Sequence, residues 1–223
     1  MKRASLALAS ALWVALCSPS TRADVVEDMF NVVKALADQG FSSAQYNLGL
    51  VYYNGLGVKQ DYAEAMAWFR KAALQGFARA QYNLGVMYDK GQGMPRNYAE
   101  AVHWYRKAAL QGNADARYNL GLMYDKGLGV PKNYTEAMDW FRKAAEQGLA
   151  LAQYALGFML AEGQGVTGDY VTAYMWVSLA ATQNDEVSKE AIKVIDKLEA
   201  LMTADQIATA QRRAAEWRPG GAH

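Results

Sequence analysis

Two kinds of short apolar stripe alternate along most of the chain. In the first kind, Ala44, Leu48 and Tyr52 are spaced four residues apart, which places them on one face of a helix. The glycines of the segment Gly55-x-Gly57 follow this stripe, and glycine accepts the left-handed backbone conformation that ends a helix. The pattern predicts a first helix that ends at Asn54.

A second stripe follows each glycine pair. Ala65, Trp68 and Phe69 form the apolar face of this predicted second helix, and Gly76 ends it. Asp61 precedes the stripe, and its carboxylate is suited to accept hydrogen bonds from the amides of the first turn. The first helix has a capping signal as well: Ser42-x-x-Gln45 stands at its start and has the form of a capping box.

The two stripes recur four times at a step of 36 residues. The first helices share a Tyr-Asn/Ala-Leu-Gly motif that begins at Tyr46, Tyr82, Tyr118 and Tyr154. The second helices share one tryptophan each, namely Trp68, Trp104, Trp140 and Trp176. One such hairpin cannot bury both of its faces, so neighbours must stack. The fold class predicted is all-α, an α/α superhelical solenoid of four helix-turn-helix repeats.

The ends of the chain differ from the repeats. Residues 25–39 align with the second helices and predict a half-repeat that caps the N-terminal end. Two amphipathic stretches, residues 184–202 and 204–217, predict capping helices at the other end. The predicted organisation is a signal peptide at 1–23, an N-terminal capping helix at 24–40, repeats at 41–182, C-terminal capping helices at 183–217 and a flexible tail at 218–223.

These motifs resemble the Sel-1-like repeat family, a relative of the tetratricopeptide repeat. The resemblance covers about residues 44–181, and it departs from the family pattern mainly in the last unit, where Leu160 stands in place of a tyrosine. It implies a right-handed superhelix that serves as an interaction scaffold, often exported in bacteria. A disulfide-rich subgroup of the family is linked to β-lactam binding or hydrolysis, but this chain lacks the paired cysteines of that subgroup.

The first residues have the order of a secretory signal peptide. Lys2 and Arg3 supply positive charge, residues 6–16 are apolar, and small residues lead up to Ala23. We expect cleavage after Ala23 and a periplasmic or secreted protein. The apolar run is too short to span a bilayer. A lipoprotein anchored through Cys17 is the less favoured alternative, because the large Leu16 precedes that cysteine.

Charge argues against one class of partner. The whole chain has 23 basic and 22 acidic residues, and loss of the signal peptide would leave 20 basic and 22 acidic residues. A protein that neutralises phosphates needs a basic excess. We therefore expect no nucleic acid partner and no membrane span.

The chain offers few residues for catalysis. His103 stands at a position that varies freely between repeats, and His223 is the terminal residue. No group of His, Cys and acidic residues has the spacing of metal ligands, and no nucleophile site is evident. We expect a protein that is not an enzyme, with no catalytic residue, no metal and no cofactor.

The first helices carry the candidate binding residues. By analogy with tetratricopeptide repeats, these helices line the concave face, where stacking aligns equivalent residues in rows. Tyrosine offers contact area with a polar tip, and asparagine can pair with a peptide backbone. The alternative is that the repeated Tyr and Asn only pack between repeats. The candidate partner-binding residues are Tyr46, Asn47, Arg79, Tyr82, Asn83, Asp89, Tyr118, Asn119, Asp125, Tyr154 and Phe158.

The sequence thus favours a non-catalytic scaffold of the cell envelope that binds a peptide or protein partner. The first alternative is a cell-envelope enzyme or a binder of cell-wall fragments of the β-lactam or muropeptide type. A second alternative is a structural element that assembles end to end. We expect a monomer or weak self-association.

Overall fold

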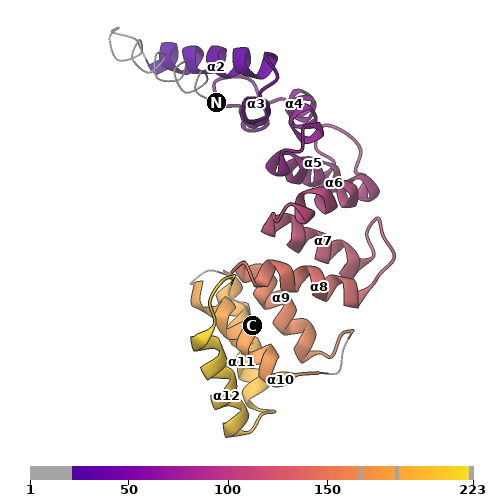
Figure 1. Ribbon diagram of the computed structural model, residues 1–223, viewed down its shortest axis with the longest axis vertical. Coiled ribbons are helices and arrows are strands. Elements are labelled where there is room, and N and C mark those ends of the chain that lie inside the picture. Colours follow the sequence, from indigo (N-terminus) through magenta and orange to yellow (C-terminus); the bar gives the residue numbers. More distant parts are fainter. Residues whose placement is uncertain (1–21, 166–167, 184–185, 221–223) are drawn as a thin grey trace. The chain divides into compact units, whose positions relative to one another are not determined.

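The computed structural model describes residues 22–165, 168–183 and 186–220. Over these ranges it contains eleven α-helices, one short 3-10 helix and no strand (Figure 1). The predicted all-helical class is therefore confirmed. Cys17 and residues 1–21 of the predicted signal peptide lie outside the described residues, so their assignment stays a prediction.

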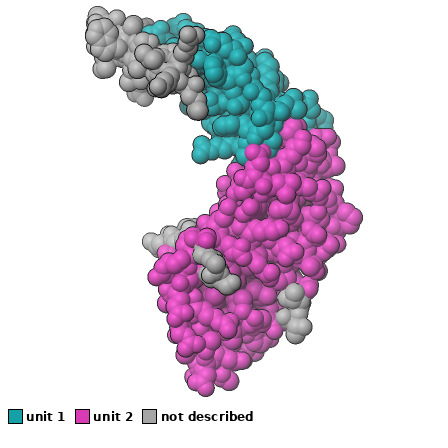
Figure 2. Space-filling view, in the orientation of Figure 1, with its two compact units in different colours: residues 1–96 teal, residues 97–223 magenta. Residues whose placement is uncertain are grey.

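The chain divides into two compact units, residues 1–96 and 97–223 (Figure 2). In the first unit each helix packs against the next one along the chain. The helices of this unit are α2 (Arg22–Asp38), α3 (Ser42–Asn54), α4 (Tyr62–Leu74) and α5 (Ala78–Lys90). Here α3 and α5 are first helices of the repeat, and α4 is a second helix.

The second unit continues the alternation of first and second helices and ends in two further helices, α11 and α12. Consecutive helices pack together from α6 to α11, α12 packs against α10, and α11 also contacts α9. The α-helices of this unit are α6 (Tyr98–Leu110), α7 (Ala114–Lys126), α8 (Tyr134–Ala145), α9 (Ala150–Ala161), α10 (Tyr170–Ala180), α11 (Glu186–Glu199) and α12 (Ala204–Glu216). The 3-10 helix η1 (Ala181–Gln183) links α10 to α11.

The second helices begin as the sequence predicts. The Asp61 carboxylate accepts hydrogen bonds from the backbone N–H groups of Ala63 and Glu64. Side chains at the equivalent positions also cap their helices, namely Asn97, Asn133 and Asp169. Each cap satisfies an amide that the first turn of a helix leaves without a partner.

The capping box expected at the first helix is wrong. Phe41 is the N-cap residue of α3, and no side chain caps this helix. Gln45 is buried instead, and its Nε2 donates to the Ala37 carbonyl oxygen of the preceding helix at 3.2 Å. The Ser-x-x-Gln spacing is compatible with a capping box and also with this bond to the preceding helix. The carbonyl groups in the last turn of α2 need hydrogen-bond donors, and Gln45 supplies one.

This bond is a recurring clasp between successive helices. At the equivalent position of each repeat, and one residue before that position on α11, the side chain donates to the carbonyl oxygen of the residue eight places earlier, in the last turn of the preceding second helix. The further clasps are Gln81 to Ala73, Arg117 to Ala109, Gln153 to Ala145 and, on α11, Ser188 to Ala180. The clasp joins each repeat to the one before it, and it marks α11 as a further helix of the first kind.

The central glycines of α3, α7 and α9 each make room for a side chain of the second helix that follows. A methyl group added at Gly49 would lie 2.5 Å from Cδ1 of Phe69, and one added at Gly121 would lie 2.6 Å from Cε1 of Phe141. Both rings are almost completely buried. The glycine therefore admits a large ring between two helices, as close packing of the core requires.

The N-terminal helix α2 packs against α3 and carries the same clasp at Ala37. Its Val26 lies against the loop at Gly57, where an added methyl group would be 2.5 Å from the valine Cγ1 atom. Met29 lies 36 residues before the buried Ala65, at the corresponding position of α2, but 64% of its surface is exposed. As a half-repeat, α2 has no first helix of its own in the described residues to cover this face.

The C-terminal helices lie close to where the sequence placed them. The capping box at Thr203 and Gln206 is present. Tyr174 of α10 links the two helices: its hydroxyl donates to Oε1 of Glu199 on α11 at 2.8 Å and accepts from Nε2 of Gln211 on α12 at 3.3 Å. The bond from Gln211 joins α12 to α10, and the bond to Glu199 joins α11 to α10. Together these two helices close the core of the second unit.

The tail predicted to be flexible from residue 218 starts with specific contacts. The Trp217 ring packs edge-on against Trp176, with 6.0 Å between the ring centroids. The backbone N–H of Gly220 donates to the carbonyl oxygen of Glu146 at 2.9 Å. Residues 218–220 thus follow the surface of the second unit because an aromatic anchor and a backbone bond hold them. Residues 221–223 lie outside the described residues.

Candidate functional site

The predicted row of tyrosines is half-buried in packing contacts. The Tyr46 ring lies 5.7 Å from the Phe69 ring and 5.1 Å from the Phe77 ring, centroid to centroid. In the second unit, the Tyr118 ring lies 5.6 Å from the Phe141 ring. These tyrosines therefore support the stacking of helices, whatever further contacts their exposed edges make.

Within the second unit, stacking brings Tyr118 and Tyr154 close together. Burial raises the pKa of the Tyr118 hydroxyl, and the nearby Tyr154 raises it further. Burial also raises the pKa of Tyr154, while Glu190 raises it and Lys193 lowers it. The row predicted on α7 and α9 therefore leads to charged residues of α11.

The polar candidates are more accessible than the tyrosines. Asn47 and Arg79 are exposed, and the other polar candidates are half-buried, namely Asn83, Asp89, Asn119 and Asp125. Asp125 is close enough to Lys132 to contribute to a raised pKa of that lysine, after the larger effect of a hydrogen bond to Tyr134. The two units each hold part of the predicted set, with Asp89 in the first and Asp125 in the second.

Phe158 belongs to the half-buried set as well. Its ring stacks on the Tyr154 ring, with 6.1 Å between the centroids and 28° between the planes. Residue spacing of four places both rings on the same face of α9. The other repeats carry aliphatic residues at this position, namely Leu50, Val86 and Leu122, and the role of Phe158 in binding stays a prediction.

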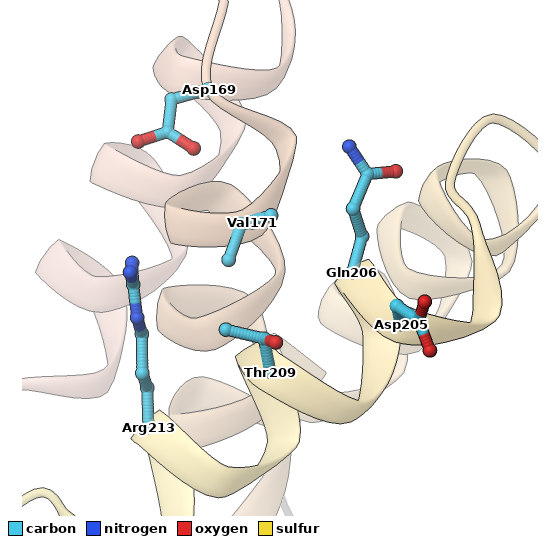
Figure 3. Close-up of a pocket in the computed structure, with 6 residues that line it drawn as sticks. All are labelled: Asp169, Val171, Asp205, Gln206, Thr209 and Arg213. Carbon is cyan, nitrogen blue, oxygen red and sulfur yellow. The ribbon is translucent and has the colours of Figure 1, made fainter.

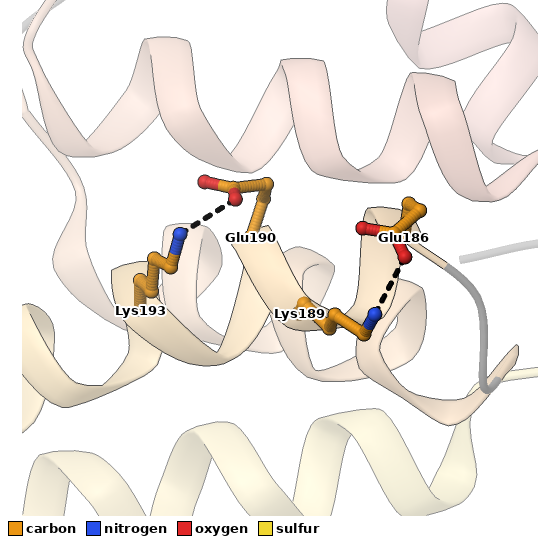
Figure 4. A network of polar contacts seen from close by, with 4 residues as sticks. All are labelled: Glu186, Lys189, Glu190 and Lys193. Carbon is orange, nitrogen blue, oxygen red and sulfur yellow. Dashed lines mark hydrogen bonds and ion pairs between the residues drawn. The ribbon is translucent and has the colours of Figure 1, made fainter.

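A line of charges on α11 adjoins this aromatic pair. Lys189 pairs with Glu186 at 2.5 Å, and Lys193 pairs with Glu190 at 2.6 Å (Figure 4). All four side chains are largely exposed, so these pairs add little to stability. Glu190 and Lys193 are close enough to Tyr154 to shift the pKa of its hydroxyl in opposite directions.

A shallow depression between α10 and α12 was not predicted. It holds about 400 Å³ and is lined by Asp169, Val171, Asp205, Gln206, Thr209 and Arg213 (Figure 3). Burial alone would raise the pKa of the Asp169 carboxyl, but hydrogen bonds from Thr172 and the charge of Arg213 lower it below its usual value. The depression arises because α12 packs on α10, a contact that the repeat pattern does not contain.

The outer side of α4 carries a second open surface. Ala63, Met66, Arg70, Lys71 and Leu74 are among the residues that line about 410 Å³ of space along this one helix. Lys71 covers the Trp68 ring, with its Nζ atom 3.6 Å from the ring centroid. The same contact between lysine and tryptophan recurs at Trp104 and Trp140.

The described residues contain neither a candidate membrane span nor a candidate metal site. No helix of the described part is both long and apolar enough to span a membrane. Within residues 22–165, 168–183 and 186–220, no three His, Cys, Asp or Glu side chains are grouped as metal ligands. The exposed His103 lies edge-on to Trp104, with 5.2 Å between the ring centroids.

Comparison with known proteins identifies the repeat. The Sel1 repeat matches residues 42–77, 78–113, 114–149 and 150–185. A solved Sel1 repeat protein from Oxalobacter formigenes is 34% identical, with a TM-score of 0.70, over 84% of this chain and 75% of that chain. Comparison with curated protein sequences gives no match.

Two further solved structures are similar. A protective antigen from uropathogenic Escherichia coli strains is 30% identical, with a TM-score of 0.55, over 86% of this chain, which spans 48% of that protein. An immunity protein from Pseudomonas aeruginosa is 22% identical, with a TM-score of 0.50, over 96% of this chain and 83% of that chain. It shares the fold.

The matched segments coincide with the helix pairs of the structure. Each begins at the first residue of a first helix, namely α3, α5, α7 or α9, and the last match ends at residue 185, two residues after η1. Sel1 repeats form helical scaffolds that generally bind other proteins and are generally non-catalytic. The chain belongs to the Sel1 repeat family.

Proposed function

We propose that the protein is an exported, non-catalytic scaffold of the cell envelope that binds a peptide segment or a protein partner on the face lined by its first helices. The observation that carries this proposal is the variation between repeats on that face. Positions that build the repeat are constant and buried, such as Leu48 and its equivalents. Accessible positions on the first helices change in charge and size from one repeat to the next.

One such position is occupied by Tyr53, Asp89, Asp125 and Ala161 in successive repeats. Because tyrosine, aspartate and alanine are all accommodated at this position, the fold does not require an acid there. Asp89 and Asp125 are each half-buried, so both are accessible in part. Residues that the architecture does not demand are the ones that can set the specificity of recognition.

The location in the envelope is supported by the first residues alone. Positive residues, an apolar run and small residues before Asp24 are typical of an exported precursor. On this basis the working protein begins at Asp24, inside the segment that forms α2. A scaffold without cysteine after that point would need no oxidising compartment to fold.

Photo-crosslinking tests the binding face. A photoreactive amino acid is placed at Asn47 or Asn119 on first helices, and at Glu64 or Glu136 on second helices. We expect crosslinked partners from the first-helix positions in living cells, and none from the second-helix positions. The same adducts from both sets would mean that binding is not confined to this face, and adducts from the second helices alone would move the site to them.

A further inference from the structure

Helices α2 and α11 are each left without one partner of the repeat. Helix α2 takes the place of a second helix, since it packs against α3 and its Ala37 carbonyl accepts the clasp. Among the described residues, no first helix precedes it. Helix α11 takes the place of a first helix, because its Ser188 donates the clasp to Ala180. The next helix, α12, packs against α10 instead of pairing with α11 as a second helix would. Helix α2 thus lacks a first helix, and α11 lacks a second helix.

Helix α2 exposes apolar side chains at positions where the other repeats are packed. Met29 is 64% exposed, whereas Ala65 and its three equivalents in the later repeats are completely buried. Val26 is 40% exposed. It stands at the position of Tyr62, whose ring lies 5.3 Å from the ring of Tyr53 on the first helix α3, centroid to centroid. The open apolar face of α2 is therefore the side that a first helix covers in the complete repeats.

Phe41, which follows α2, belongs to the same open face. It is 46% exposed. Its equivalent one repeat later, Phe77, lies 5.1 Å from the ring of Tyr46 on the first helix α3. Val26, Met29 and Phe41 thus gather where one first helix would lie. Because the fold is built from one repeated contact, the other repeats show what covers such a face: a helix of the first kind.

Helix α11 leaves open the side by which a first helix contacts its second helix. Counted from the clasp residue Ser188, Ile192 takes the place of the central glycine. Ile192 is 50% exposed. Lys189 and Asp196 take the places of the two tyrosines that contact the second helix in the first repeat, and both are exposed. Helix α12 therefore does not cover this side, and α11 is a first helix that is free to accept a second helix.

The sizes of the side chains on the two open faces are complementary. In the first repeat, Gly49 makes room for the large ring of Phe69. On α2 the smaller Val33 takes the place of that phenylalanine, and on α11 the larger Ile192 takes the place of the glycine. The large and the small residue are exchanged between the helices, so the space between them would be filled as close packing requires.

The charged groups of α11 are suited to this contact as well. Lys189 takes the place of Tyr46 and would lie against the Phe41 ring, and an ammonium group is attracted to an aromatic face. Lys189 also pairs with Glu186 (Figure 4), so no unpaired cation is buried. Asp196 would lie near the first turns of α2, where the helix dipole favours a carboxylate.

We infer that α11 of one copy covers the open face of α2 of a second copy, so that copies of the protein join end to end. Each joined pair keeps one free α2 and one free α11, so further copies can add. A standard interface takes about 20–30 residues from each partner, whereas α2 has 17 residues and α11 has 14. The association is therefore weak. It goes beyond the proposed function, because joined copies would present several first-helix faces to one partner.

Sedimentation velocity of the exported protein tests this association. Measurements from about 1 μM to about 1 mM cover the dissociation constants of weak interfaces. The weight-average mass should rise with concentration and exceed that of a dimer. Met29→Lys and Ile192→Lys each place a charge at an exposed position of one face, and each should weaken the association at least about tenfold. The matched control is Leu110→Lys, at a leucine that is 71% exposed on α6, and it should associate like the wild type.

Circular dichroism shows whether each variant is folded. If Met29→Lys does not fold, Val26→Lys tests the same face of α2. If Ile192→Lys does not fold, Lys189→Glu tests the same side of α11, because it replaces the cation that would lie against Phe41 and places a second carboxylate beside Glu186.

An equimolar mixture of the two variants tests which faces meet. The Met29→Lys variant keeps an intact α11, and the Ile192→Lys variant keeps an intact α2, so the mixture should form dimers and nothing larger. Association that only Met29→Lys weakens would mean that α2 does not pair with α11, and the inference is then refuted. A wild type that stays monomeric at about 1 mM, or one that only Leu110→Lys impairs, refutes it too. Asp89 and Asp125 are unchanged in every variant, so capture of a partner on the first helices can succeed or fail independently.

Discussion

Removal of the Trp104 side chain tests how the repeats are held together. Trp104 is 4% exposed, and a buried tryptophan removes about 150–250 Å² from water. At about 25 cal/mol per Å², its burial stabilises the fold by about 4–6 kcal/mol. Its indole N–H has no hydrogen-bond partner among the described residues, so substitution breaks no such bond. Partial collapse of the cavity lowers the expected cost of Trp104→Ala to about 3–5 kcal/mol.

Urea unfolding followed by far-ultraviolet circular dichroism measures this loss. The adjacent and exposed His103 provides the control, and His103→Ala should change stability by less than about 0.5 kcal/mol. Trp140 is only half-buried, so Trp140→Ala should cost clearly less than Trp104→Ala. An unchanged midpoint for Trp104→Ala, or a larger loss for Trp140→Ala, would refute the assignment of the core.

Three further predictions concern the packing and the start of the chain. Gly121→Ala would place a methyl group 2.6 Å from Cε1 of the buried Phe141, so it should destabilise by about 1–3 kcal/mol in the same unfolding assay; a gain in stability would contradict the packing described. Gln81→Leu removes the donor that the Ala73 carbonyl receives at 3.1 Å and should cost about 1–3 kcal/mol, whereas a neutral effect would show that the clasp is dispensable. N-terminal sequencing of the exported protein should give Asp24, and a start at a lipidated Cys17 would replace the secreted form by a membrane-anchored one.

Most of the fold follows from the sequence because each local signal repeats. Four capped second helices, four central glycines and four tryptophans at one spacing leave little choice of architecture. The sequence could not rank the tryptophans by their burial, since burial depends on the side chains packed around each ring. Trp104 is buried, whereas Trp140 is half-buried. It also misassigned Gln45, because a glutamine at this position suits a capping box as well as a clasp to the previous helix.

The ends of the chain and the site were harder to predict. Some contacts occur only once in the chain, such as Trp217 on Trp176 and the bond from Gly220 to Glu146. No repeated residue pattern marks them in the sequence. The depression between α10 and α12 depends on such a contact. The rows of tyrosine were recognised from their period, but a period cannot separate packing from binding. The apolar residues at positions 151, 155, 158 and 161 of α9 are visible in the sequence only as departures from the other repeats.

Reversal of two acidic residues on the first helices tests the central claim most directly. Asp89→Lys combined with Asp125→Lys changes positions that the first and fourth repeats fill with Tyr53 and Ala161, so the fold should survive. Capture of partners from envelope extract should fall sharply and depend on salt, because charge at an interface governs association. The control is Glu100→Lys with Glu136→Lys on second helices, which should capture partners like the wild type. Normal capture by the first variant together with impaired capture by the control would place the binding face on the second helices and contradict the account.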